Sequence, residues 1–467
     1  MEKNGVKMEP SSPTSTAVTD PRKPGSDGAP PEPVTKKDLR RVAGGTFIGS
    51  MLEYFDFSLY TLAASLIFAQ LFFSDLDPTT GRILSFVTLF MGYAARPVGG
   101  VVFAHFGDKI GRKNILVLTI LIMGVSSLAI GLLPTYDTIG IWAPIILVLL
   151  RIFQGFGAGA EAAGASTMMT EFAPKGKRGW YSSLQYSGLV AGTALASLVF
   201  LWISSAGDAA VLDGLWRIPF IASAVLVVVA LYLRSKVKDS PTFEKMKEQQ
   251  HVIKSPMKSV FKHSKKSLLV GIGLRTAESA GSSIYKSLGA SYVAGVALSG
   301  REDATSIVSL SILIASAVGI VVVPIVGALS DRFGRRTMFR VSTLFQICAA
   351  FPIWWLLANG NSVEIIISMS VALGVGVWSG LALQGATIPE LFGVQHRYTG
   401  VVLSRELPSI FAGGLVPTIG AALLAAYSDS WVPLAILTIV YTLPAFIASV
   451  FMRDTTDRDL YSMKDAM

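Results

Sequence analysis

The fold is decided by the stretch Gly327-Ala-Leu-Ser-Asp331-Arg-Phe-Gly334-Arg335-Arg336, a polar loop between two long apolar segments. A related loop stands 223 residues earlier, which is the difference between Asp331 and Asp108, and it reads Ala104-His-Phe-Gly-Asp108-Lys-Ile-Gly111-Arg112-Lys113. Because this offset is close to half of the 467 residues, the chain contains an internal repeat. The repeat predicts two parallel halves with the same number of helices.

A second pair of motifs repeats in step with these loops. Glu171 and Arg178 are seven residues apart, as are Glu390 and Arg397. In each loop a glycine permits a tight turn, the Asp can meet the positive N-terminus of a neighbouring helix, and an Arg can pair with a Glu. We predict that these groups latch the inner ends of the halves together, with Glu390 and Arg397 as one pair. The predicted gating residues are Asp108, Arg112, Glu171, Arg178, Asp331, Arg335, Glu390 and Arg397.

The composition predicts an all-α integral membrane protein. The chain is 51% hydrophobic and 15% charged. The charges come in bunches that separate apolar runs of roughly 20 residues or more, the length a helix needs to cross about 30 Å of hydrocarbon. We predict twelve spans, near 44–72, 82–106, 114–134, 141–172, 180–204, 215–234, 267–298, 304–330, 337–358, 362–392, 398–427 and 431–452.

The regions between and around the spans are polar. Seven prolines lie between Pro10 and Pro33, before any apolar run, so we expect no cleavable signal peptide. The predicted organisation is a disordered cytoplasmic tail (1–40), an N-terminal six-helix half (41–234), a cytoplasmic linker (235–266), a C-terminal six-helix half (267–452) and a cytoplasmic C-terminal tail (453–467).

The positive charges predict the orientation. Of the 40 Lys and Arg residues, five lie within the spans and three lie in outer loops if the N-terminus is inside; the remaining 32 lie in the tails and inner loops. This asymmetry follows the positive-inside rule, which explains the net charge of +9 better than nucleic-acid binding does. Both termini are therefore predicted to be cytoplasmic, with the protein in the plasma (inner) membrane. Cys348, the single cysteine, is predicted to be a buried thiol.

At the two polar loops the chain resembles the major facilitator superfamily, whose signature loop is Gly-x-x-x-Asp-Arg-x-Gly-Arg-Arg. The second copy matches it fully, and the first departs from it at Ala104 and Lys109. The resemblance extends to the metabolite:proton symporters, the branch that includes proline/betaine, shikimate and oxoglutarate carriers. The matching segments include Glu53-Tyr-Phe-Asp56-Phe, Arg96-Pro97-Val-Gly99-Gly100, Arg151-Ile-Phe-Gln154-Gly155, Trp216-Arg217-Ile-Pro219-Phe and Asp239-Ser-Pro241-Thr-Phe243.

Ionisable residues inside the spans are the candidate functional groups, because each costs several kcal/mol in hydrocarbon unless it lines a cavity or has a partner. At 1.5 Å per helical residue, Asp56 and Arg96 both lie about 18 Å from the inner ends of their spans, near the midplane. We expect Arg96 to bind a substrate carboxylate, and Asp56, tuned by Arg96, to be the leading proton carrier. The predicted substrate-binding residues are Arg96, Arg275, Arg405, Tyr60, Gln154 and Gln185. The predicted proton-coupling residues are Asp56, Glu53, Glu161, Glu278 and Arg151.

Two of these arginines carry further expectations. Arg151 lies about 30 Å from the inner end of its span, so we expect it to serve an outer gate, packing or a proton path rather than the central pocket. The resemblance implies a part in proton transfer. Arg405 and Glu406 are neighbours on a helix and point about 100° apart, so they cannot both face one ligand.

These features predict a secondary active transporter that takes up a small organic acid with protons, such as shikimate, a dicarboxylate or an aromatic carboxylate. The alternative is a proton-coupled carrier of zwitterionic osmolytes such as proline or betaine; a transporter-like sensor or an efflux carrier fits less well. The four histidines lie at inner loops or span ends, so we predict no enzyme activity, metal or cofactor. The expected partners are a small-molecule substrate, protons and the lipid bilayer, with the monomer as the functional unit.

Overall fold

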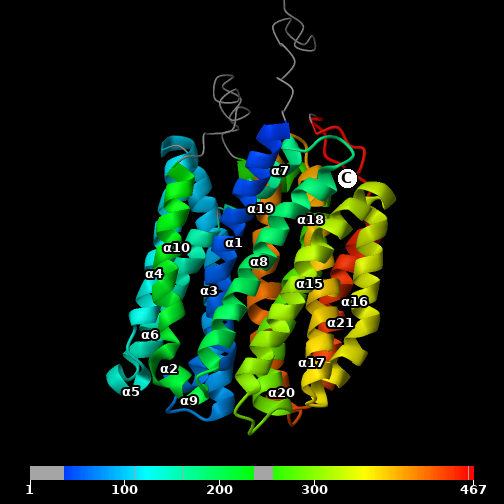
Figure 1. Cartoon of the computed structure of the whole chain (residues 1–467). Coiled ribbons are helices and arrows are strands. Elements are labelled where there is room, and N and C mark those ends of the chain that lie inside the picture. The colour runs from blue at the N-terminus through cyan, green and yellow to red at the C-terminus, as the bar shows by residue number, and fades with distance from the viewer. Residues whose placement is uncertain (1–35, 111, 160, 236–255, 461) are drawn as a thin grey trace, which may run out of the picture.

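The computed structural model describes residues 36–110, 112–159, 161–235, 256–460 and 462–467. Within these ranges the chain forms a bundle of twelve spans, several of them built from consecutive helical pieces (Figure 1). Both the start of the first helix and the C-terminus lie at one end of the bundle, called the terminal end below. The predicted linker lies mostly outside the described residues.

The N-terminal half contains six spans. They are α1 (Lys36–Leu66), α3 (Pro78–Ile110), α4 (Arg112–Leu132), α6 (Trp142–Ala158) followed by α7 (Glu161–Phe172), α8 (Arg178–Ser204) and α10 (Arg217–Ser235). Short connecting elements at the opposite end are α2 (Phe68–Phe72), α5 (Tyr136–Ile139), α9 (Asp208–Ala210) and η1 (Val211–Leu215). The helix α1 begins at Lys36, inside the segment predicted as a tail, and the remainder of that segment lies outside the described residues.

The C-terminal half repeats this plan after the short helix α12 (Pro256–His263). Its spans are α13 (Lys265–Ser283) with η2 (Ile284–Gly289), α14 (Ala290–Tyr292) and η3 (Val293–Ala297); α15 (Ala304–Phe333); α16 (Arg335–Ala358); α17 (Ser362–Met369) with η4 (Ser370–Val377) and α18 (Trp378–Leu391); α19 (Arg397–Pro408) with η5 (Ser409–Gly414) and α20 (Leu415–Ala426); and α21 (Val432–Phe451). The η segments are wide π-helical turns. They interrupt spans seven, ten and eleven, and such turns are frequent at functional sites.

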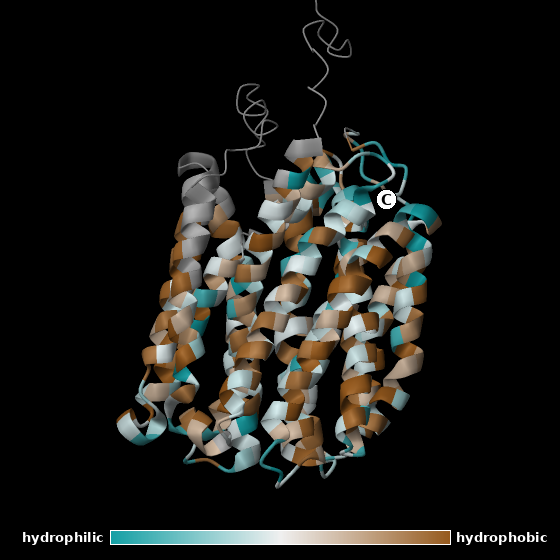
Figure 2. Cartoon of the chain, in the orientation of Figure 1, coloured by the Kyte–Doolittle hydropathy of each residue, from teal (hydrophilic) through white to brown (hydrophobic). Residues whose placement is uncertain are grey.

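Seven helical stretches in the described part are long and apolar enough to cross a membrane, and two shorter apolar helices accompany them. The helices α1 and α13 are long but less apolar, because they carry ionisable residues such as Asp56 and Glu278. Hydrophobic residues, brown in Figure 2, predominate along the middle of the bundle, and hydrophilic residues gather at the terminal end. Large apolar side chains such as Val228 and Trp202 are about two-thirds exposed on the outer surface, as lipid contact requires.

The single cysteine departs from expectation. Cys348 lies on α16 with its side chain exposed, so the prediction of a buried thiol is wrong. It faces outward on a helix whose neighbouring side chains Leu344 and Phe345 are also exposed. An apolar run in a membrane protein is buried in lipid on one face and in protein on the other, and hydropathy alone does not distinguish the two faces.

Small residues set how closely the spans pack. A Cβ atom on Gly99 of α3 would overlap the backbone carbonyl of Phe156 on α6, and one on Gly155 would overlap Gly92. Across the halves, Gly179 of α8 and Gly327 of α15 touch each other in the same way. Side chains at these positions would push the backbones apart, so the glycines fix the approach that places Arg96 and the gate residues.

Candidate functional site

A buried ion pair joins the two halves in the interior of the bundle. The Arg96 Nε of α3 lies 3.0 Å from the Glu406 Oε2 of α19, and both side chains are at most 5% exposed. Arg96 also lies over the ring of Phe57, with 5.6 Å to the centroid. Glu53 of α1 is buried and close enough to Arg96 to interact with it electrostatically. Arg96 is therefore compensated by acids from both halves.

A second cluster lies on the seventh span. Arg275 contacts Glu278 three residues along the same helix and donates a hydrogen bond to the Gln384 side-chain oxygen at 2.9 Å. The Lys286 ammonium lies 5.6 Å from the centre of the Tyr54 ring, which α1 contributes. All of these cations are at least nine-tenths buried. These charged side chains of α13 and η2 therefore face the interior of the bundle.

Arg405 and Glu406 point to different helices of the N-terminal half, which agrees with the expectation from helical geometry. Glu406 reaches Arg96 of α3, whereas Arg405 donates a hydrogen bond to the Tyr186 hydroxyl of α8. The Arg405 Nε is buried and has no hydrogen-bond partner among the described atoms. Gln185, next to Tyr186, is also buried, and neither its side-chain nitrogen nor its side-chain oxygen has a hydrogen-bond partner among the described atoms. These are donors and an acceptor available to a ligand.

Asp56 belongs to a different network from the one expected. Its Oδ2 accepts a hydrogen bond from Ser127 at 2.5 Å, Ser127 accepts one from the Gln154 amide at 2.7 Å, and the Gln154 oxygen accepts one from Arg151 at 2.5 Å. The expectation that Arg96 tunes Asp56 is wrong, because the guanidinium linked to Asp56 is that of Arg151. Spans one, three and four thus supply one continuous polar chain.

Arg151 lies beside the aromatic side chains of the first span. Its guanidinium carbon is 4.0 Å from the centre of the Tyr60 ring and 4.8 Å from that of Phe57. The Tyr60 hydroxyl donates a hydrogen bond to the Thr88 hydroxyl at 2.6 Å, which fixes the Tyr60 ring beside Arg151. Arg151 is thus the cationic end of the hydrogen-bonded chain that leads through Gln154 and Ser127 to Asp56. The side chain of Glu161 lies outside the described residues.

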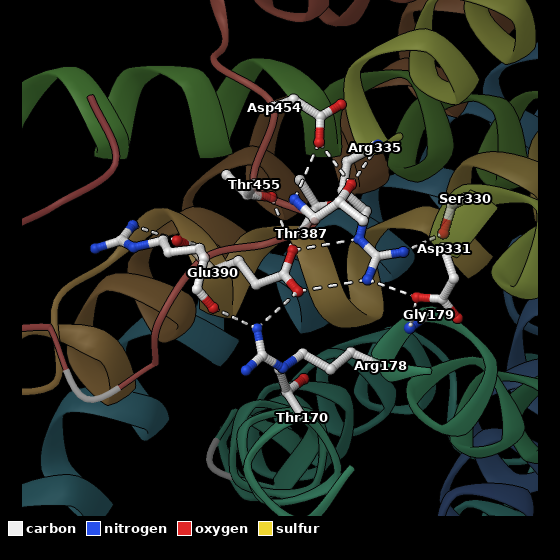
Figure 3. A network of polar contacts seen from close by, with 12 residues as sticks. Thr170, Arg178, Gly179, Ser330, Asp331, Arg335, Thr387, Glu390, Asp454 and Thr455 are labelled. Atoms are coloured by element: carbon white, nitrogen blue, oxygen red, sulfur yellow. Dashed lines mark hydrogen bonds and ion pairs between the residues drawn. The ribbon is translucent and has the colours of Figure 1, made fainter. Parts of the chain in front are cut away.

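The terminal end is closed by a network centred on Glu390 (Figure 3). The Glu390 carboxylate is fully buried; it lies 3.2 Å from Arg335 Nε and 3.8 Å from Arg178 Nη1, and it accepts a hydrogen bond from Thr455 at 2.7 Å. Arg178 begins α8 of the N-terminal half, whereas the other partners belong to the C-terminal half. The expected pairing of a signature-loop Arg with a Glu is therefore present at Arg335.

The signature-loop Asp caps a helix of the other half. Asp331 accepts hydrogen bonds from the backbone amides of Gly179 and Trp180 at 2.8 and 2.9 Å, and it pairs with Arg335 at 2.9 Å. An anion at a helix N-terminus satisfies unpaired amides and interacts favourably with the helix dipole. This is the contact that the loop sequence predicted. The side chains of Asp108 and Arg112 lie outside the described residues.

The Glu–Arg pairs cross between the halves. Arg397 lies 2.8 Å from Glu171, and Arg178 lies 3.8 Å from Glu390. The prediction that Glu390 pairs with Arg397 is therefore wrong. The equal spacing in the two halves reflects an exchange of partners about the pseudo-symmetry axis, so each Glu meets the Arg of the other half.

The C-terminal segment is part of the same closure. Arg178 donates to the backbone oxygen of Arg458 at 2.6 Å, and Arg397 donates to that of Leu460. Burial alone would raise the pKa of Asp454, but hydrogen bonds from Thr456 and from the Arg336 amide lower it below the ordinary Asp value. The backbone of this segment therefore bridges arginines of both halves.

Sequence reasoning predicted no partner or role for Glu406, and it did not single out Ser127 or Thr455. Glu406 carried a signal, since it is an acid within a span, whereas Ser127 and Thr455 carried none because hydroxyl residues are common in spans and tails. Within the described residues, no group of three or more His, Cys, Asp or Glu side chains is placed to hold a metal ion.

Comparisons with known proteins extend this description. The family model described as Major Facilitator Superfamily matches residues 46–412. The chain is 36% identical over 415 residues to the putative transporter YdfJ of Escherichia coli K12, covering 88% of this chain and 96% of the relative. It is 34% identical to the shikimate transporter of the same strain (89% and 95% covered) and 32% identical to its proline/betaine transporter (92% and 88% covered).

Among solved structures, the chain is similar in fold to the proton:xylose symporter XylE bound to 6-bromo-6-deoxy-D-glucose. The TM-score is 0.67 at 16% sequence identity, and the match covers 91% of this chain and 98% of the other. A double-tryptophan variant of XylE gives a TM-score of 0.69 at 17% identity, covering 91% and 98%. At this level of identity the likeness concerns the fold.

Proposed function

Because the chain belongs to the major facilitator superfamily, and is thus a membrane transporter of small molecules, we propose that it imports a small organic acid together with protons. Shikimate, a dicarboxylate or an aromatic carboxylate are the proposed kinds of substrate. The observation that carries the proposal is that buried cations from spans two, seven and eleven, namely Arg96, Arg275 and Arg405, interact with one or both of the same two residues, Glu406 and Tyr186.

An anionic substrate follows from the electrostatics of this interior. Burying a guanidinium is unfavourable unless an anion or hydrogen-bond acceptors surround it, and Arg405 has a tyrosine hydroxyl rather than a carboxylate as its partner. A substrate carboxylate would supply the missing negative charge. The planar guanidinium of Arg96, Arg275 or Arg405 would hold that group through paired hydrogen bonds. Arg96 is the proposed first contact, and Tyr60, Gln154 and Gln185 are further substrate-binding residues of the proposal.

Proton coupling is assigned to the chain that starts at Asp56. Asp56, Ser127, Gln154 and Arg151 form a continuous set of hydrogen bonds, and the second oxygen of Asp56 is buried without a partner among the described atoms. A carboxyl in this position can bind a proton in one state and release it in another as the chain rearranges. Glu53, Glu161 and Glu278 are the reserve acids of the proposal.

The gate and the orientation complete the proposal. We place the terminal end in the cytoplasm, because the Lys and Arg residues concentrate there, and we place the protein in the inner membrane as a functional monomer. The described conformation is then closed on the cytoplasmic side by Glu390, Arg178, Arg397 and their partners. Uptake requires these contacts to separate once substrate and proton are bound.

The alternative substrate is a zwitterionic osmolyte. The aromatic rings of Tyr54, Phe57 and Tyr93 lie close to one another, with Tyr93 edge-on to Phe57 at 5.1 Å, and such rings can contact a quaternary ammonium. However, Lys286 already lies over the Tyr54 ring, and Arg96 and Arg151 lie over the Phe57 ring. Three resident cations disfavour a fourth, so the organic acid is the stronger candidate.

Uptake into proteoliposomes tests the proposal. Purified protein is reconstituted and given radiolabelled shikimate, succinate, benzoate and proline, each with and without an inward proton gradient. Accumulation of one acid that depends on the gradient is the expected result. Accumulation of proline alone would favour the osmolyte carrier, and failure to accumulate any acid would refute the proposal.

A further inference from the structure

Glu406 holds the only interior ion pair that joins the two halves within the described part of the chain. The other ion pairs there that cross between halves, Arg178 with Glu390 and Arg397 with Glu171, lie at the terminal end. Glu406 is buried on α19, and its partner Arg96 lies on α3. The residue proposed to meet the substrate carboxylate is therefore already bound to a carboxylate of the protein.

The charges around Glu406 come from three helices. Arg96 contacts it directly from α3, and Arg275 of α13 interacts with it electrostatically. Arg96 in turn interacts with Glu53 of α1, while Arg275 contacts Glu278 on its own helix. Glu406 thus lies between two guanidinium groups that both have a second acid nearby. Loss of its charge would leave Arg96 with one fewer anion but not without any.

We propose that Glu406 is an internal competitor of the substrate and thereby a specificity-determining residue, an inference that rests on the proposed function. In the empty carrier its carboxylate occupies Arg96 in place of the substrate carboxylate. A substrate anion must displace it, and this displacement breaks the interior contact between the halves. A ligand that lacks the negative charge cannot compete for the guanidinium and leaves the pair intact.

The geometry explains why displacement and conformational change are linked. The helix α3 packs through Gly99 and Gly100 against α6, so Arg96 moves with the N-terminal half. Glu406 is three residues before the π-helical turn η5 (Ser409–Gly414), at which the eleventh span can change its helical register. When the substrate takes Arg96, Glu406 is released on a helix that is locally able to bend, and the interior no longer ties α3 to α19.

The test compares binding of radiolabelled shikimate to the purified full-length wild type and to Glu406→Gln. Removal of the competing charge should tighten binding about tenfold, which corresponds to about 1.4 kcal/mol. Binding of shikimate methyl ester, measured by displacement, should not tighten. A merely structural role for Glu406 predicts weaker binding, so a damaged site cannot imitate the expected result.

Asp303→Asn is the control, because it removes a carboxylate whose partner Arg301 belongs to the same half and lies outside the proposed site. It should not tighten binding. If Glu406→Gln proves unstable, Glu406→Asp withdraws the carboxylate by one methylene and should give a smaller tightening. Unchanged or weaker binding in the Glu406 variants, or equal tightening in Asp303→Asn, overturns the inference while the proposed function stands. A wild type that binds none of shikimate, succinate and benzoate refutes the proposed function itself, and the inference with it.

Discussion

Replacing Arg397 by glutamate should open the terminal end of the bundle. Arg397 lies 2.8 Å from Glu171, with side chains 4% and 30% exposed, and it is one of two arginines there whose ion pairs cross between the halves. The variant removes this attraction and places two carboxylates together. The closed state of the variant lacks an ion pair that the closed wild type has, whereas the open state has this pair in neither protein. The equilibrium therefore shifts toward the open state.

The size of the shift follows from the burial of the pair. Exposed ion pairs are worth about 0–1 kcal/mol, whereas breaking a fully buried pair costs roughly 3–5 kcal/mol. A pair with one partner a third exposed lies between these limits, so we expect about 1–2 kcal/mol, a factor of roughly 5–30 in the ratio of closed to open states. The double variant Glu171→Arg with Arg397→Glu exchanges the two charges and should recover at least half of this free-energy loss.

The assay is the labelling rate of a reporter cysteine. Thr170 is fully buried, and its hydroxyl donates to the Gly385 carbonyl of the other half at 2.9 Å, so Thr170→Cys is protected while the halves are closed. Cys348 is exposed and is replaced by serine in every sample.

A water-soluble maleimide should label the Arg397→Glu variant roughly 5–30 times faster than its parent, the factor expected from the shifted equilibrium. Arg301→Gln, which breaks a pair within one half at the other end, is the control and should change nothing. An unchanged rate in Arg397→Glu, or no recovery in the double exchange, would refute the reasoning.

Three further predictions follow from the described contacts. Asp56→Asn keeps the hydrogen bond from Ser127 but removes the charge, so it should retain substrate counterflow and lose pH-driven accumulation; accumulation with the wild-type pH dependence would exclude Asp56 from coupling. Gly99→Val forces a side chain against the Phe156 carbonyl and should destabilise the protein by about 1–3 kcal/mol, seen as a lower melting temperature, whereas Gly44→Ala, at a position with open space, should not. Thr455→Val removes the hydrogen bond that holds the C-terminal segment to Glu390, and the backbone of this segment accepts hydrogen bonds from Arg178 and Arg397 of the two halves. The variant should therefore speed labelling at Thr170→Cys severalfold, as a loss of about 1–2 kcal/mol implies; an unaltered rate would show that the C-terminal segment does not hold the gate.

The spans could be predicted from the sequence because one physical requirement, an apolar length matched to the bilayer, determines them. The second half illustrates this: 304–330 was predicted and α15 runs from Ala304 to Phe333. The contact of Asp331 with a helix N-terminus was also predicted, because the unpaired amides at such an end attract an acid. The sequence did not show that this helix would be α8 of the other half, whose Gly179 is 152 residues away.

The partners of the charged residues could not be predicted in the same way. Depth along a span placed Asp56 and Arg96 at one level, but depth does not give the direction in which a side chain points around the helix axis. Asp56 faces Ser127, and Arg96 faces Glu406, which is 310 residues away in sequence. Whether Arg151 belonged to an outer gate or to a proton path also depended on which residues the fourth span meets.

The exchange of partners at the gate has a consequence for how the carrier opens. If each Glu were paired with the Arg seven residues along its own half, separating the halves would break no gate ion pair, and the motif could not sense the conformation. Because Glu171 meets Arg397 and Arg178 meets Glu390, one movement of the halves breaks both contacts together. The same movement would break the hydrogen bonds from Gly179 and Trp180 to Asp331. If the halves separate as proposed, the free energies of these contacts add in the closed state and vanish together on opening, so we expect a cooperative gate with few partly opened states.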